Sequence, residues 1–138
     1  MVAFHLSFPI RDLASTRAFY GDVLACPVGR STGAWIDFDF FGHQLSAHLD
    51  ATLAETAAHC EMDGKRVPLR HFGVVLPWNR WEALAHRLRD AKCPFTVEPH
   101  VRFAGEPGEQ GTFFVSDPSG NALEFKTYRH PANVFAVA

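Results

Sequence analysis

The chain has 138 residues, the size of one typical domain, and 47% of them are hydrophobic, which is ordinary for a globular core. Its formal net charge is −2 and its lysines and arginines are scattered, so it lacks the basic stripe on which nucleic-acid binding depends. No run approaches the roughly 18 apolar residues of a membrane span, and no charged segment precedes an apolar one at the start, so we expect a cytoplasmic protein with no membrane partner.

Residues 1–50 predict a strand, a helix and three more strands. Apolar and polar residues alternate over 4–8, which indicates a strand that Pro9 helps to end. Asp12 can cap a helix whose apolar residues recur at helical spacing up to Pro27. Three short strands follow at residues 28–30, 35–40 and 43–49. Phe41–Gly42 supplies the turn between the last two strands.

Residues 50–68 show no clean period and collect Thr, Ala, Asp, Gly and Pro, which indicates a linker with one loose helical turn around 51–59. The first pattern then starts again, with a strand over 69–76 and a helix that Asn79 can cap. Three further strands are predicted at residues 94–103, 110–117 and 121–128. The segment Asp117–Asn121 has the composition of a hairpin turn between the last two strands.

This repetition predicts an α+β fold built from two βαβββ modules within a single domain. Module one covers about residues 1–50, the linker 51–68, module two about 69–128, and a C-terminal tail 129–138. We expect the tail to cover either the entrance to a site formed by the modules or a contact between two copies of the chain. Because the modules leave exposed faces, we expect a homodimer.

Three residues that are far apart in the chain have the chemistry of metal ligands. His5 and His71 lie on the first predicted strand of modules one and two, and Glu124 lies on the last strand of module two. In each strand the alternation turns the residue away from its bulky apolar neighbours. Two imidazoles and one carboxylate form the facial set that holds Fe(II) or Mn(II) and leaves coordination positions open. The sequence therefore predicts a metal site that a substrate can reach, and hence an enzyme.

Polar residues of module one are predicted to face the same site. On its last strand, Gln44, Ser46 and His48 share one face. His48 is interpreted either as an acid or base beside the metal or as a plain polar lining residue. Asp37 and Asp39, on the preceding strand, either line the site or form the solvated face of that strand.

Several motifs, spread over nearly the whole chain, are similar to one known superfamily. They are Phe4-His5-Leu6, the run from Arg11 to Tyr20, and the closing Asp117-Pro118-Ser119-Gly120-Asn121-Ala122-Leu123-Glu124. The chain resembles the vicinal oxygen chelate superfamily, which includes glyoxalase I, the fosfomycin-resistance thiol transferases, the bleomycin-binding proteins and the type I extradiol dioxygenases. The stretches 40–44, 101–103 and 107–110 look like the small single-domain proteins described as predicted extradiol-type dioxygenases.

The resemblance implies paired half-barrel sheets around a metal cup. It implies a divalent cation bound by His5, His71 and Glu124, with Fe(II) expected and Mn, Zn or Ni as alternatives. Glyoxalase I enzymes have a further ligand in the region of Gln44 to His48. No carboxylate lies on this strand, which disfavours a glyoxalase activity.

The resemblance also bears on proton transfer and substrate binding. The large extradiol enzymes carry a Tyr before their Asp-Pro-x-Gly turn and a further His, whereas this chain has Phe114 there and no His between 100 and 130. In a dioxygenase the proton transfers would then fall to His48 and Tyr128. Arg102 or Lys126 would balance an anionic substrate. The full set of expected substrate contacts is Gln44, Asp37, Arg102 and Phe114.

The leading prediction is an Fe(II)-dependent, ring-cleaving dioxygenase that acts with O2 on a catechol-like or other vicinal-dioxygen small molecule. The second is a Mn- or Ni-dependent lyase, isomerase or thiol transferase, which turns over without O2. The third is a ligand-sequestering protein like the bleomycin binders, which typically lack the three metal ligands. Since this chain has all three, the sequence favours an enzyme.

Overall fold

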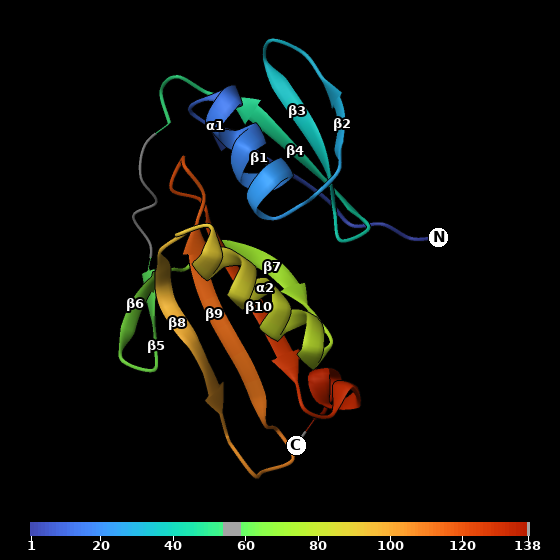
Figure 1. Ribbon diagram of the computed structural model, residues 1–138, viewed down its shortest axis with the longest axis vertical. Coiled ribbons are helices and arrows are strands. Elements are labelled where there is room, and N and C mark those ends of the chain that lie inside the picture. Colours follow the sequence, from blue (N-terminus) through green and yellow to red (C-terminus); the bar gives the residue numbers. More distant parts are fainter. Residues whose placement is uncertain (54–58, 138) are drawn as a thin grey trace. The chain divides into compact units, whose positions relative to one another are not determined.

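The computed structural model describes residues 1–53 and 59–137 and confirms the α+β class with repeated βαβββ modules (Figure 1). The chain divides into two compact units, Met1–Glu55 with Asp117–Asn121, and Thr56–Ser116 with Ala122–Ala138. Each unit has its own four-stranded sheet. The loose helical turn predicted around 51–59 falls largely outside the described residues. Within those residues, no helix has the length and apolar character to cross a membrane.

The first unit is a mixed sheet in the order β1-β4-β3-β2, with a short helical segment. Its elements are β1 (His5–Ile10), α1 (Leu13–Arg17), the π-helical turn η1 (Ala18–Val23), β2 (Val28–Ser31), β3 (Trp35–Phe40) and β4 (His43–Leu49). β1 runs parallel to β4, and the other pairs are antiparallel. The predicted cap of α1 is confirmed, because Asp12 Oδ2 accepts a hydrogen bond from Ser15 N at 2.7 Å.

Alternation along its strands gives the first sheet two chemically different faces. One face is buried with Tyr20 and consists of Phe8, Ile10, Ile36, Phe38, Phe40, Leu45 and Ala47. The opposite face, called the His5 face below, carries His5, Ser7, Trp35, Asp37, Gln44, Ser46 and His48. β1 runs on through Pro9 to Ile10 instead of ending at Pro9. As an edge strand, β1 tolerates a residue that cannot donate to the ladder.

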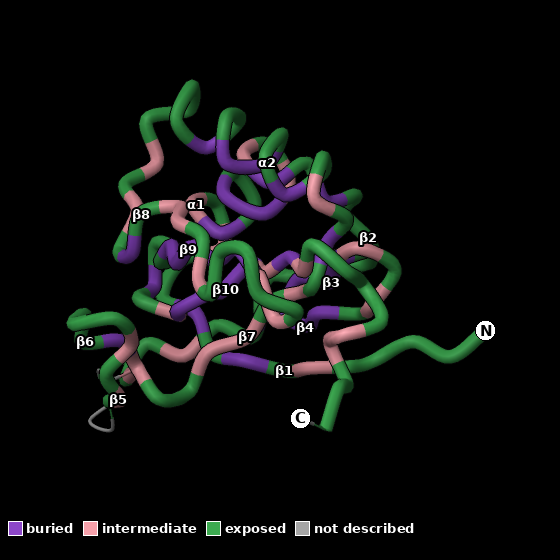
Figure 2. The backbone as a smooth tube through the Cα atoms, turned by 90° about the horizontal axis from the view of Figure 1, so that it is seen from below, coloured by how far each residue is buried: buried purple, intermediate pink, exposed green. Residues whose placement is uncertain are grey.

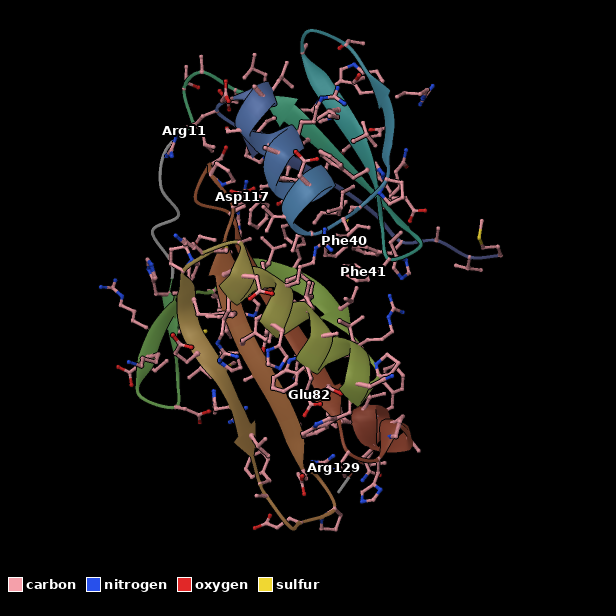
Figure 3. The ribbon with its side chains drawn as sticks, in the orientation of Figure 1. Arg11, Phe40, Phe41, Glu82, Asp117 and Arg129 are labelled. Atoms are coloured by element: carbon pink, nitrogen blue, oxygen red, sulfur yellow. The ribbon has the colours of Figure 1, made fainter. Side chains whose placement is uncertain are left out.

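The turn Asp117–Asn121 joins β9 to β10, yet it belongs to the first unit. Asp117 Oδ1 accepts from the main-chain N–H groups of Ser119 and Asn121 at 2.9 and 2.8 Å. Asp117 Oδ2 accepts from the Tyr20 hydroxyl and from Asn121 Nδ2, both at 2.9 Å. Figure 3 labels Asp117 beside the helical segment that carries Tyr20. Burial, with the Asp117 carboxylate as a further cause, raises the pKa of Tyr20 well above its usual value.

The second unit repeats the plan with a longer helix. Its elements are β5 (His59–Met62), β6 (Lys65–Pro68), β7 (His71–Val75), α2 (Trp78–Asp90), β8 (Phe95–Arg102), β9 (Gln110–Ser116), β10 (Ala122–Tyr128) and the 3-10 turn η2 (Pro131–Phe135). The main sheet has the order β7-β10-β9-β8, with β7 parallel to β10. The prediction that Asn79 caps α2 is wrong, because the N-cap is Pro77, two residues earlier, and the helix begins at Trp78. Pro77 needs no donor there, and its carbonyl accepts from Trp81 N at 3.0 Å.

The second sheet also has two different faces, and α2 covers one of them. The buried side of α2, seen as purple stretches in Figure 2, consists of Trp81, Leu84, Ala85 and Leu88. Trp81 donates from Nε1 to the Phe125 carbonyl at 2.9 Å and packs against the Phe113 ring. The opposite face, called the Glu124 face below, carries His71, Gly73, Thr112, Phe114, Glu124, Lys126 and Tyr128.

The segment predicted as a linker contains a β-hairpin, β5–β6. Its turn is Asp63–Gly64, with φ of 49° and 79°, the left-handed pair that closes a two-residue hairpin. Val67 of the hairpin is buried against Val97 and Phe114. Because Phe114 lies on the Glu124 face, the hairpin packs on that face.

Two residues of β8 bind the turn of this hairpin. His100 Nε2 lies 2.7 Å and Arg102 Nε 3.1 Å from Asp63 Oδ2. The hydrogen bond from His100 lowers the pKa of Asp63, and the charge of Arg102 adds to this. The hairpin is therefore fixed at its turn by ionic contacts and at its base by apolar ones.

Replacing Thr127 with valine is expected to raise the free energy of unfolding by about 1 kcal/mol. Thr127 is fully buried on the α2 side of β10, and its Oγ1 has no hydrogen-bond partner among the described residues. Valine keeps the shape and the β-branch while removing an unsatisfied hydroxyl. Urea unfolding with an unchanged m-value measures the effect. A less stable Thr127→Val protein would mean that the hydroxyl has a partner.

Candidate functional site

Two of the three predicted metal ligands meet on the Glu124 face. His71 is on β7 and Glu124 on the adjacent strand β10, two residues apart in the parallel register. His71 Nε2 lies 3.3 Å from Glu124 Oε1. The side chains are 22% and 9% exposed, so the carboxylate is nearly buried while the imidazole still reaches the surface. The pair is therefore reachable from the surface through the imidazole of His71.

His71 Nδ1 and Glu124 Oε2, the outer atoms of this pair, face away from each other and are hydrogen-bonded to other groups of the second unit. His71 Nδ1 lies 2.8 Å from the Pro68 carbonyl oxygen, which only accepts, so Nδ1 carries the proton. The Thr112 hydroxyl donates to Glu124 Oε2 at 2.6 Å. The His71 ring also packs edge-on against Phe114, with centroids 5.0 Å apart. Both side chains are thus oriented before any ligand arrives.

These bonds leave His71 Nε2 and Glu124 Oε1 facing each other. In the neutral form of the ring, with Nδ1 protonated, His71 presents a lone pair at Nε2 beside the carboxylate oxygen Oε1 of Glu124. In that form two acceptors lie 3.3 Å apart, a pair that a metal cation can hold together. An outer hydrogen bond from imidazole to a carbonyl is also the usual support of a metal-bound histidine. The residues present therefore fit a divalent cation.

The third predicted ligand, His5, has the same arrangement on the His5 face of the first unit. Gln44 donates from Nε2 to Asp37 Oδ2 at 3.3 Å, which identifies Gln44 Oε1 as the atom that accepts from His5 Nδ1 at 2.9 Å. In the neutral ring His5 Nε2 then carries the lone pair, and among the described residues it meets the Ser7 hydroxyl, at 3.3 Å. Gln44 thus fixes the tautomer of His5 as Pro68 fixes that of His71.

Asp37 completes the series of hydrogen bonds that runs through Gln44 to His5. It is buried, accepts from the Ser46 hydroxyl at 2.7 Å, and lies 3.9 Å from the Arg30 guanidinium. Since Asp37 also accepts from Gln44 Nε2, the geometry gives Asp37 a supporting position behind the Gln44–His5 hydrogen bond.

The structure does not bring all three predicted ligands into one described cluster. His71 and Glu124 lie together in the second unit, whereas His5 lies in the first. Over residues 1–53 and 59–137, no three His, Cys, Asp or Glu side chains form a group able to hold a metal ion. The joint site of His5, His71 and Glu124 therefore stays a prediction.

The predicted acid–base residues lie on the faces that carry the ligands. His48 is exposed on the His5 face, four residues or about 13 Å along β4 from Gln44, so it is too distant to touch a cation at His5. Tyr128 is on the Glu124 face, four residues after Glu124, and the Lys126 ammonium lies 5.6 Å from its ring centroid.

Two of the predicted substrate contacts have other partners. Arg102 is bound to Asp63, so its charge is already balanced by a carboxylate. Phe114 is fully buried, so it packs beneath His71 and has no surface for a ligand. Lys126 remains the candidate cation nearest in sequence to Glu124, the predicted ligand.

Sequence reasoning missed two residues that orient the pair. Thr112 is one of several buried residues in an apolar strand, and only the register of β9 against β10 brings it to the Glu124 side chain. Pro68 acts through its main-chain carbonyl, which no side-chain pattern reveals. The Asp63–Gly64 turn could have signalled the hairpin that positions Pro68.

Comparison with known proteins identifies relatives of the whole chain. The structure of a glyoxalase/bleomycin resistance protein/dioxygenase from Alicyclobacillus acidocaldarius is 32% identical, with a TM-score of 0.81 over 97% of this chain and 96% of that one. The fosfomycin resistance protein FosX from Listeria monocytogenes is 15% identical (TM-score 0.67; 92% of this chain, 93% of that one). A lactoylglutathione lyase from Agrobacterium tumefaciens is 16% identical (TM-score 0.62; 91% and 92%). The last two similarities concern the fold alone.

No curated protein matches the chain. A family model, in contrast, matches residues 3–125, which include the first sheet, the second sheet as far as Phe125 of β10, and all three predicted ligands. The match thus covers most of both βαβββ modules seen in the structure. The protein therefore belongs to the Glyoxalase/Bleomycin resistance protein/Dioxygenase superfamily, whose members typically bind a divalent metal and act on small-molecule substrates.

Proposed function

We propose that this protein is an Fe(II)-dependent enzyme of the extradiol ring-cleavage type, acting with O2 on a catechol-like or other vicinal-dioxygen molecule. The observation that carries the proposal is the His71–Glu124 pair, whose Nε2 and Oε1 atoms face each other at 3.3 Å while their outer atoms are already bonded. His5, with the same tautomer, is the proposed third ligand. Two neutral imidazoles and one carboxylate are the set that non-heme Fe(II) enzymes use.

When bound, Fe(II) supplies an electrophilic centre with open positions and a source of electrons for O2. The protein's own groups orient and charge-balance that centre. Glu124 contributes the negative charge, and Thr112 keeps its second oxygen from turning toward the cation. We assign to His48 and Tyr128, each four residues or about 13 Å along its strand from a proposed ligand or its partner Gln44, the exchange of the diol proton through intervening water, and to Lys126 the attraction of an anionic substrate.

A second candidate is a lyase, isomerase or thiol transferase that uses Mn or Ni without O2. The observation that favours it is Gln44, which contacts His5 directly and stands in the region where glyoxalase I enzymes have a further ligand. The neighbours named as a fosfomycin resistance protein and a lactoylglutathione lyase show that the same fold occurs in proteins of this second kind.

Members of the superfamily often form dimers, and we propose a homodimer here. In that assembly His5 joins His71 and Glu124 either from the same chain or from the second copy. Light scattering on the eluting protein gives the mass directly.

The test of function compares oxygen-dependent and oxygen-independent turnover. Protein purified without oxygen is loaded with Fe(II), its metal content is measured, and oxygen uptake is followed on addition of a panel of catechols. We expect about one metal per chain and oxygen uptake with at least one diol. Turnover of an electrophile with a thiol under Mn(II) or Ni(II), with no oxygen uptake, would favour the second candidate. Absence of metal from the loaded protein would contradict both and leave a ligand-binding protein.

A further inference from the structure

Gly73 is placed where no side chain fits. It lies on β7 directly opposite Glu124 of β10. A Cβ atom added to Gly73 would lie 1.5 Å from the carbonyl oxygen of Glu124, 2.6 Å from its carbonyl carbon and 3.2 Å from its nitrogen. Real Cβ atoms essentially never approach another heavy atom closer than 3.0 Å. All three neighbours are main-chain atoms, so no change of rotamer relieves the clash.

Conformational freedom does not explain this glycine. The glycines with positive φ are Gly42, Gly64, Gly105 and Gly120, and Gly73 is not among them. What Gly73 permits is the close approach of β7 to β10 at the position of Glu124.

The atoms that a side chain would displace belong to the residue that carries the carboxylate. His71 precedes Gly73 by two residues, and its Nε2 reaches Glu124 Oε1 across the same strand pair at 3.3 Å. Moving the Glu124 peptide far enough to admit a Cβ requires a shift of more than 1 Å, whereas metal–nitrogen and metal–oxygen bonds are confined to about 2.0–2.2 Å for ions such as Zn²⁺. Such a shift would take one ligand out of reach of a cation held by the other.

We propose that Gly73 is a positioning residue of the metal pair: its missing side chain sets the β7–β10 spacing at which His71 and Glu124 hold one divalent cation. The proposal rests on the metal-binding part of the proposed function and is independent of the substrate and of O2.

Gly111 provides a matched control in the same sheet. A Cβ at Gly111 would lie 2.8 and 3.0 Å from two atoms of the Trp81 ring and 3.0 Å from Thr127 Cγ2. Those neighbours are side chains on the face covered by α2, and none belongs to the metal pair. Gly111→Ala therefore crowds the sheet without touching the pair.

The experiment measures Co(II) binding by the full chain carrying Gly73→Ala or Gly111→Ala, beside the unchanged protein. Co(II) serves as the probe because its absorption spectrum reports the geometry of its ligands. We expect Gly73→Ala to weaken Co(II) binding by about 10- to 100-fold and to change the spectrum, as loss of other orienting groups does in metal sites. Gly111→Ala is expected to lower the thermal midpoint while keeping the unchanged protein's affinity and spectrum.

Three results would overturn the proposal. Wild-type affinity and spectrum in Gly73→Ala would show that the spacing is not needed. An equal loss of binding in Gly111→Ala would assign the effect to general packing of the sheet. Failure of Gly73→Ala to fold, while Gly111→Ala folds, would make Gly73 a requirement of the sheet and not of the pair.

A second readout needs no metal and separates this proposal from the proposed function. In the unchanged protein, NMR should detect a nuclear Overhauser contact between the His71 ring and the Glu124 side chain, and Gly73→Ala should lose it. If the unchanged protein binds no Co(II), the metal function fails. Persistence of the Overhauser contact in Gly73→Ala would then overturn the positioning role as well.

Discussion

Replacing Glu124 with glutamine is expected to abolish metal binding while leaving the fold intact. The carbonyl oxygen of the introduced amide can still accept from the Thr112 hydroxyl, and its NH2 group would then face His71 Nε2, a donor opposite an acceptor. The repulsion between two acceptors disappears, but so does the charged ligand. Since loss of an outer partner alone costs about 10- to 100-fold in metal affinity, loss of the carboxylate itself should cost more than about 100-fold.

The measurement is Fe(II) content and affinity after anaerobic loading, with thermal unfolding of the metal-free protein alongside. Glu98→Ala is the matched control, because Glu98 is an exposed glutamate of the same sheet, paired with Arg89. We expect the control to bind metal normally. Retention of tight Fe(II) binding in Glu124→Gln would remove Glu124 from the ligand set, and with it the basis of the proposed function.

Replacing Asp117 with alanine is expected to lower the free energy of unfolding by about 3 kcal/mol or more. The carboxylate accepts four hydrogen bonds, two from main-chain N–H groups of its turn and two from side chains. Tyr20 has no exposed surface, so its hydroxyl would lose its partner where water does not reach it. The turn would lose its closing bonds at the same time.

A graded series separates the two contributions. Tyr20→Phe removes the buried donor and leaves Asp117 with three hydrogen bonds, so it should cost only about 1 kcal/mol. Asp117→Asn keeps an acceptor for the turn and should fall between the two. Urea unfolding of these variants and of the double variant gives the coupling between Tyr20 and Asp117. Additive effects of Tyr20→Phe and Asp117→Ala would contradict a direct bond between the two side chains.

Most strands could be predicted because the residue alternation and the turn residues that define them are close together in the sequence. Alternation of period two located β3 and β4 with their observed bounds, and the turn residues from Asp117 to Asn121 located the hairpin β9–β10. The hairpin β5–β6 was missed because only Val67 among its residues is fully buried, so its hydrophobic pattern is faint although its Asp63–Gly64 turn is a strong signal.

The sequence predicted the candidate ligands of the site, but it did not predict the residues that orient them. His71 and Glu124 stood out as polar residues among apolar neighbours, and the structure places them together. Thr112, Pro68 and Gly73 act through the register between strands or through main-chain atoms, and a single sequence shows neither. The sequence pattern predicts a linker around Asp63 and so gives no sign that Asp63 forms an ion pair with Arg102, which the sequence predicted to contact the substrate.

The two histidines differ in how easily mutation can alter them. His5 donates its hydrogen bond to the Gln44 side chain, so one codon change at Gln44 can switch the tautomer of His5 or add a competing ligand. His71 donates its hydrogen bond to a main-chain carbonyl, which every amino acid at position 68 supplies. Evolution of this sequence can therefore change the two histidines unequally. Substitution at position 44 can alter the hydrogen bonding, and so the basicity, of the His5 ring, whereas the hydrogen bond of the His71 ring survives most substitutions at position 68.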